Sequence, residues 1–231
     1  MRKLLLLLLC LSTPALAYQV QPMIVDLASH GKKSLVTYRL QNPSESALPI
    51  EIEVFKRTFD ENQKEVLVPA EDDFIVLPPQ VEVPAKSYQV FRAKYLGSAE
   101  LKETDSYRIV FKQLPLPNED EKSGVKMVFN FATLVFVSPE GISAQQKSTL
   151  SCLKLEDCKL TISNEGQRVL DLSHFDYHFH EGKTTVNWAQ FQSITPGRFI
   201  MPGHKVELDI APLLSEQPTS SAALINLFNK K

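Results

Sequence analysis

One run of the chain has the residue types of a metal site, because three histidines and an aspartate alternate with aromatic residues: His174-Phe175-Asp176-Tyr177-His178-Phe179-His180. On a β-strand the polar members would share one face and the aromatic members the other. Zinc binds imidazole and carboxylate groups at about this reach. A half-buried strand with its aromatic side chains in the core has the same alternation. We therefore assign no metal and no cofactor, and zinc binding at this strand stays an open alternative.

A second candidate for chemistry is the cysteine pair Cys152 and Cys158, with five residues between them that include Glu156-Asp157. In an oxidising compartment, a disulfide across the end of a hairpin is the expected state of such a pair. A redox motif would need two intervening residues, and a zinc site would need further ligands nearby. The spacing therefore predicts a local disulfide, which contributes about 2.4 kcal/mol at most.

The patterns of the common enzyme classes are missing from the sequence. It has no glycine-rich phosphate loop, no Gly-x-Ser-x-Gly and no defensible Ser/His/Asp order. Glu51 and Glu53 alternate with isoleucines, which indicates a solvated strand face and not a catalytic carboxylate pair. The single tryptophan, Trp188, is expected in a hydrophobic core. The sequence therefore predicts a protein that is not an enzyme.

The N-terminus has the three parts of a secretory signal peptide. Arg2 and Lys3 precede the apolar run 4–11, and a small-x-small site ends at Ala17, so we expect a mature chain that begins at Tyr18. The apolar run is too short to span a bilayer, and no later segment is long and apolar enough for membrane insertion. Removing two of the 25 basic residues leaves 23 against 27 acidic residues, a net charge of −4, which argues against nucleic-acid binding.

Beyond the signal peptide, short runs of β-branched and aromatic residues alternate with turn signals, and no stretch has a helical period. Strands are expected at 18–27, 34–41, 48–57, 73–77, 81–83, 88–95, 106–114 and 125–137, then, after a linker at 139–146, at 148–155, 158–164, 174–181, 205–210 and 222–228. This pattern predicts an all-β protein of two sandwich domains, residues 18–139 and 140–231, after a signal peptide at 1–17.

The run 125–137, VKMVFNFATLVFV, is apolar on both faces of a strand. With one charge and no proline, it would attract other strands if it lay at an exposed sheet edge. Two interpretations are open: a central strand covered on both faces, or an edge strand lent to another protein that pairs with its backbone. The polar, acidic loop 118–124 favours the second, because such a loop could leave the start of the strand at the surface.

Several short motifs occur in a definite order: Asn42-Pro43-Ser44, Asp73-Phe74-Ile75-Val76-Leu77-Pro78-Pro79-Gln80, Pro84-Ala85-Lys86-Ser87 with Val90-Phe91-Arg92, Tyr107-Arg108 through Leu114-Pro115, Pro202-Gly203 and Ala223-Leu224-Ile225-Asn226. Together with the signal peptide, they resemble the PapD-like periplasmic chaperones of the chaperone–usher pilus pathway. The resemblance spans essentially the whole mature chain.

This resemblance implies two immunoglobulin-like β-sandwiches with a cleft between them. It also implies a periplasmic chaperone that lends a strand to pilus subunits, which are sandwiches lacking one strand, and delivers them to an outer-membrane usher. The donor residues would be Val125, Met127, Phe129 and Phe131. Each large apolar side chain moved from water into a subunit groove contributes roughly 1.5–3 kcal/mol before ordering costs. Phe129 and Phe131 would be the strongest contributors, since aromatic anchors usually dominate interfaces.

Family members also use a basic pair to hold the subunit's terminal carboxylate, but here Ile24 and Leu134 stand at the corresponding positions. Neither side chain can form a charge-assisted hydrogen bond. In this departure the chain resembles the divergent branches of the family called alternative or archaic. Arg92, Lys112 and Lys126 are the candidates for a relocated anchor, with Arg108 as a weaker one, and Arg92 is preferred because it lies in a matched motif.

A function from a different class is also compatible with the apolar run 125–137. A secreted adhesion protein or structural subunit could self-assemble through the same edge. The two classes differ in solution behaviour, because a chaperone should form one-to-one complexes with a subunit and a structural subunit should polymerise.

Overall fold

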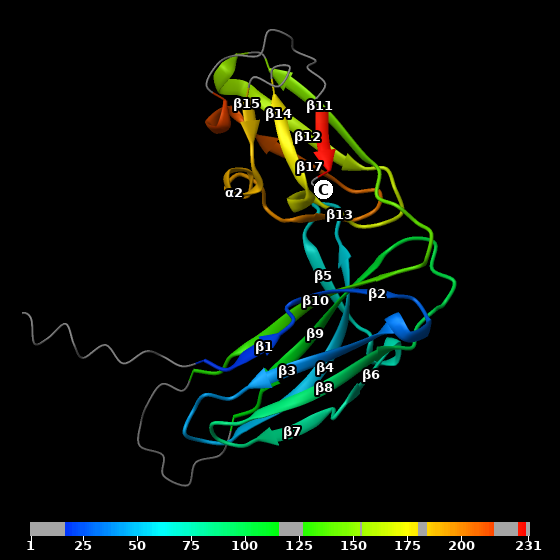
Figure 1. Ribbon diagram of the computed structural model, residues 1–231, viewed down its shortest axis with the longest axis vertical. Coiled ribbons are helices and arrows are strands. Elements are labelled where there is room, and N and C mark those ends of the chain that lie inside the picture. Colours follow the sequence, from blue (N-terminus) through cyan, green and yellow to red (C-terminus); the bar gives the residue numbers. More distant parts are fainter. Residues whose placement is uncertain (1–16, 116–126, 153, 180–183, 215–225, 230–231) are drawn as a thin grey trace, which may run out of the picture. The chain divides into compact units, whose positions relative to one another are not determined.

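The computed structural model of the chain describes residues 17–115, 127–152, 154–179, 184–214 and 226–229. These residues form two compact units, one of Met1–Gly97 with Ser106–Val135 and one of Ser98–Asp105 with Phe136–Lys231. Strands dominate both units (Figure 1), which confirms the all-β prediction. The expected signal peptide lies outside the described residues except for Ala17. The cleft and the domain boundaries stay predictions.

Two sheets build the first unit. One has four strands in the order β1 (Gln19–Gln21), β3 (Leu35–Gln41), β8 (Tyr88–Tyr95) and β6 (Phe74–Leu77). The other has six, in the order β2 (Ile24–Ala28), β10 (Asn130–Ser138), β9 (Asp105–Gln113), β4 (Leu48–Phe59) and β5 (Glu65–Pro69), with β7 (Gln80–Val83) paired to β4. The 3-10 helices η2 (Gly31–Ser34) and η3 (Glu71–Asp73) lie in the connections.

Aromatic rings fill the space between these two sheets. The strand period of two turns every second residue of β3 and β8 inward, which buries Tyr38 and Phe91 completely. Both rings contact Phe111 of β9 edge-on, with centroids 5.3 Å and 5.2 Å from it. Such edge-to-face pairs add about 0.5–1.5 kcal/mol each to the burial term. This core holds β9, and with it the neighbouring strand β10, in place.

The single first strand expected at 18–27 is wrong, because the chain changes sheets there. β1 pairs with β3 in the four-stranded sheet, whereas β2 pairs with β10 in the six-stranded sheet. Pro22 lies between them and has no N–H to donate to a ladder. The run at 125–137 is described from Met127 onward, and its regular strand begins at Asn130.

Three small sheets and one short helix make up the described part of the second unit. The strands are β11 (Gln146–Cys152), β12 (Cys158–Asn164) and β17 (Lys205–Asp209); β13 (Leu170–Asp171) and β16 (Phe199–Ile200); and β15 (Thr184–Val186), β14 (Phe175–Phe179) and β18 (Asn226–Asn229). The 3-10 helices are η4 (Leu155–Asp157), η5 (Leu172–His174) and η6 (Ala211–Leu213). The helix α2 (Trp188–Phe191) was not expected from the sequence; it begins with a capping box in which Asn187 and Gln190 bond reciprocally.

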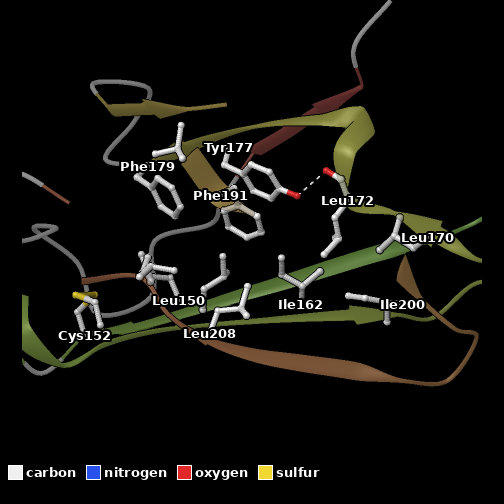
Figure 2. Packing of buried hydrophobic residues seen from close by; sticks show 14 residues of the cluster. Leu150, Cys152, Ile162, Leu170, Leu172, Tyr177, Phe179, Phe191, Ile200 and Leu208 are labelled. Atoms are coloured by element: carbon white, nitrogen blue, oxygen red, sulfur yellow. Dashed lines mark hydrogen bonds between the residues drawn. A yellow bond between two sulfur atoms is a disulfide. The ribbon is translucent and has the colours of Figure 1, made fainter. Parts of the chain in front are cut away.

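The second unit has a hydrophobic core of its own, shown in Figure 2. Tyr177 of β14 stacks on Phe191 of α2 with ring centroids 3.6 Å apart, and its hydroxyl donates to the Leu172 carbonyl at 2.7 Å. Trp188 is partly buried against the same cluster. The aromatic residues of the histidine-rich run thus serve this core, as the simpler interpretation of that run expected.

The predicted disulfide is confirmed. Cys152 and Cys158 are opposite each other in the β11–β12 pairing and are bonded, with η4 forming the turn between the strands. Both cysteines are buried, and Cys152 lies at the edge of the core in Figure 2. The bond therefore closes one hairpin of the second unit.

Each unit contains a buried asparagine that fastens the turn after one of its strands. Asn42 donates to the Val83 and Pro84 carbonyls at 3.1 Å and accepts from the Ser44 N–H. Asn164 donates to the Ile200 carbonyl at 3.1 Å and accepts from the Gly166 N–H. A buried amide is tolerated only when its groups are paired. The Asn42-Pro43-Ser44 motif therefore has a structural role.

Candidate functional site

The apolar run that contains β10 changes from buried to exposed along its length. Thr133 and Val135 are fully buried, whereas Phe129, Val128 and Met127 have exposed fractions of 36%, 47% and 70%. Phe131, between these two parts, is half-buried. The large apolar side chains of 127–129 are therefore not covered by the sandwich. Contiguous exposed apolar residues of this kind indicate an interaction site.

The start of β10 lies near Tyr18, which directly precedes β1, a strand of the four-stranded sheet. Tyr18 contacts Phe129 and Phe131, and further on the Met23 carbonyl accepts the Leu134 N–H at 2.8 Å. The residue numbers therefore increase together along the two segments, from Tyr18 to Met23 and from Phe129 to Leu134, so the segments run parallel. Among the described strands, β1 pairs with β3 in the other sheet, so β2 covers only the later part of β10. The first residues of β10 therefore have a strand neighbour on the β9 side alone.

Side chains join this first part of the edge to β9. The Gln113 side chain accepts from the Phe129 N–H at 3.2 Å, and the Asn130 side chain accepts from the Gln113 N–H at 3.2 Å. The Tyr18 hydroxyl lies 2.7 Å from the Phe111 carbonyl oxygen and 2.8 Å from the Phe129 carbonyl oxygen. The edge is therefore fixed in an extended form although its outward backbone has no strand partner in the described chain.

The later part of β10 is anchored from inside the sandwich. The Thr133 hydroxyl donates to the Ile109 carbonyl of β9 at 3.1 Å and lies 3.3 Å from the Tyr38 hydroxyl. Burial raises the pKa of Tyr38 to about 12, so its hydroxyl stays protonated at any ordinary pH. One strand thus joins a fixed, buried half to an exposed apolar half.

The preferred anchor, Arg92, lies away from this edge. It is exposed on β8, opposite Thr37 and Leu77, in the four-stranded sheet. The structure does not bring Arg92 together with β10, which belongs to the six-stranded sheet. Lys126 and Val125 lie outside the described residues.

Lys112 lies on β9, the strand next to β10. Its ammonium group is 2.6 Å from a Glu53 carboxylate oxygen and 3.8 Å from one of Glu51. The hydrogen bond to Glu53 raises the pKa of Lys112 above its ordinary value. Unlike Arg92, Lys112 lies in the same sheet as the exposed edge, but a bound carboxylate would compete with these two glutamates.

The guanidinium groups of Arg57 and Arg108 share one partner. Arg108 lies 2.9 Å from Glu65, and Arg57 bonds to the same carboxylate. Burial alone would raise the pKa of Glu65, but the hydrogen bonds from Arg108 and Arg57 hold it below the ordinary value. These charges join β4, β5 and β9 and are engaged with one another.

Among the described residues, which exclude His180, no three His, Cys, Asp or Glu side chains gather as metal ligands would. His174 lies in η5, where its ring is 3.4 Å from Asp171, and His178 lies 3.0 Å from the Thr185 hydroxyl. No helix in the described part is long and apolar enough to cross a membrane.

Residues 19–143 match the family described as "Pili and flagellar-assembly chaperone, PapD N-terminal domain". The chain belongs to the PapD-like family of chaperones. The sequence resemblance is therefore confirmed at the level of the family, while the divergent branch stays a prediction. A comparison with curated proteins finds no match.

Solved structures of PapD-like chaperones have the same fold at low sequence identity. The class 5 fimbriae chaperone CfaA is 15% identical, with a TM-score of 0.59 over 93% of this chain and 99% of that one. A chain from the Salmonella enterica complex of the SafA pilin with the SafB chaperone is 13% identical, with a TM-score of 0.59 over 94% and 98%. One from the CsuC–CsuE complex of the archaic Csu pili of Acinetobacter baumannii is 15% identical, with a TM-score of 0.54 over 83% and 89%.

Sequence reasoning missed the residues that fix the exposed edge, Tyr18 and Gln113. Tyr18 was assigned to a strand, and no local pattern indicates that its hydroxyl reaches a segment 111 positions away. Gln113 ends β9 as an ordinary polar residue. Only the folded structure brings Tyr18 and Gln113 into contact with Phe129.

Proposed function

We propose that this chaperone binds pilus-type subunits in the periplasm by strand donation and delivers them to an outer-membrane usher. The donated segment comprises Met127, Phe129 and Phe131, and Val125 extends it beyond the described residues. The observation that carries the proposal is the exposure of Met127, Val128 and Phe129 directly before β10, a strand whose later residues are buried. Donor-strand complementation by pilus chaperones is itself an established case of β-augmentation.

The energetics favour this use of the edge. Among the described strands, none pairs with the first residues of β10 on the side away from β9, so a subunit strand could add main-chain hydrogen bonds there. Moving Met127 and Phe129 from water into a subunit groove would contribute roughly 1.5–3 kcal/mol each. Because Tyr18 and Gln113 already order the backbone, less conformational entropy is lost on binding.

We propose Lys112, ahead of Arg92, as the anchor for the subunit's terminal carboxylate. It shares a sheet with the donor edge, and its ammonium group could exchange the longer 3.8 Å contact to Glu51 for a subunit carboxylate. A charge-assisted hydrogen bond of this kind contributes about 1.5–3 kcal/mol.

The test is co-expression of the tagged full chain with candidate pilus subunits in a bacterial periplasm, followed by affinity purification. Wild type should retain one subunit per chaperone, and Phe129→Glu should retain none while keeping its melting temperature. Leu77→Glu is the matched control, since Leu77 is 56% exposed in the other sheet. That variant should capture subunits normally. Absence of a complex with wild type, together with long oligomers that Phe129→Glu abolishes, would instead support a self-assembling structural subunit.

A further inference from the structure

We propose that the Tyr18 side chain is a positioning residue for the donor segment and that it fixes where the chaperone's own core ends and the donated surface begins. This inference rests on the strand-donation function proposed above. It concerns Tyr18 alone, which directly precedes β1 and has an exposed fraction of 4%.

The Tyr18 ring covers the last side chain of β10 that still belongs to the sandwich. It packs edge-on against Phe131, with ring centroids 4.6 Å apart, and Phe131 is half-buried as a result. Two residues earlier, directly before β10, Phe129 is 36% exposed, and within the described residues no ring covers it as Tyr18 covers Phe131. The boundary between covered and donated side chains therefore lies at the Tyr18 ring.

The Tyr18 hydroxyl fixes the backbone at the same boundary. It lies within hydrogen-bond distance of the Phe111 and Phe129 carbonyl oxygens, and its single proton can serve either one. Burial raises the pKa of Tyr18 to about 12, so the hydroxyl remains a donor at physiological pH. Both carbonyls are on the β9 side, because Phe111 belongs to β9 and the Phe129 N–H also bonds to Gln113 of β9. The hydroxyl therefore joins the segment to β9 just before the regular strand β10 begins at Asn130.

A conservative pair of variants separates positioning from stability. Tyr18→Phe keeps the ring on Phe131 and removes only the hydroxyl. Tyr38→Phe is the matched control, because it removes a buried hydroxyl that lies 3.3 Å from Thr133 in the later part of the same strand. Both variants are made in the full chain, exported to the periplasm and compared with wild type.

Two readouts are measured for each protein: the exchange rate of the Phe129 and Asn130 amides in the free chaperone, and the association rate with a captured subunit. We expect Tyr18→Phe to speed exchange and to slow association, each about fivefold, the effect of one net hydrogen bond. Tyr38→Phe should change the melting temperature but neither readout.

Two results would overturn the inference: wild-type values of both readouts in Tyr18→Phe, or equal changes in the two variants, which would make the effect one of stability. If wild type captures no subunit, strand donation fails, while the amide exchange of free Tyr18→Phe still decides whether Tyr18 positions the segment.

Discussion

Two halves of one apolar run have similar composition and opposite environments. Thr133, Val135 and Val137 are buried in the chaperone, whereas Met127, Val128 and Phe129 are exposed. A protein that needed the run only for its own stability would gain nothing from keeping the first half in water. The difference shows that the fold buries only part of the apolar surface of this run. The exposed part persists although an exposed apolar edge promotes aggregation.

The same chemical change should act differently on the two halves, and this is the largest expected effect. Val135→Glu places a charge in a site with no exposed surface, so the protein should fail to fold or lose more than about 4 kcal/mol of stability. Phe129→Glu should change stability by less than about 0.5 kcal/mol. Thermal unfolding of both purified variants checks this. Equal destabilisation would mean that Phe129 belongs to the core.

Removing the disulfide should lower the free energy of unfolding without changing the exposed residues 127–129. Cys152→Ser with Cys158→Ser opens the β11–β12 hairpin of the second unit. The short closed loop predicts a loss of about 2.4 kcal/mol at most. Chemical denaturation measures the loss, and subunit capture near neutral pH should remain. Loss of capture in a variant that is still folded would place part of the binding function in the second unit.

Removing a positive charge next to the exposed edge should act differently from removing one in the other sheet. Lys112→Met should weaken subunit binding up to about tenfold if the lysine holds a carboxylate, because a charge-assisted hydrogen bond is lost. Arg92→Ala, on the other sheet, should leave the affinity unchanged within about twofold. Titration of a purified subunit strand peptide against each variant gives the affinities. The reverse order would restore Arg92 as the anchor.

The smallest effect concerns pH. The pKa of Glu65 is held below its ordinary value of 4.5 by Arg108 and Arg57 against the opposing effect of burial, and Arg198 and Ser173 hold that of Asp171 below 3.8 in the same way. A lowered pKa in the folded state adds stability that is present above the ordinary value and is lost as the pH falls through the lowered one. Melting temperatures should therefore fall below about pH 4, and less so in Glu65→Gln. An identical pH profile in that variant would contradict the assignment to Glu65.

The sequence predicted the class of fold because strand alternation and turn residues are local signals. The disulfide at Cys152 and Cys158 and the buried aromatic residues of 175–179 could be inferred in the same way. The change of sheets at Pro22 could not, because the segments on both sides of it have strand-forming residues and only their partners differ. The roles of Tyr18 and Gln113 depend on contacts between distant positions, which no local pattern encodes. For the same reason the sequence could not tell that Arg92 and β10 belong to different sheets.

The most direct test of strand donation is amide hydrogen exchange along 127–137 in the free chaperone and in its complex with a captured subunit. We predict that the amides of Asn130 and Ala132, which face away from β9 as the Leu134 N–H does, exchange at least about a hundredfold more slowly in the complex, because a subunit strand then pairs with them. Those of 135–137 should be protected in both states. Unchanged exchange at Asn130 and Ala132, with protection appearing elsewhere on the chaperone, would contradict the account.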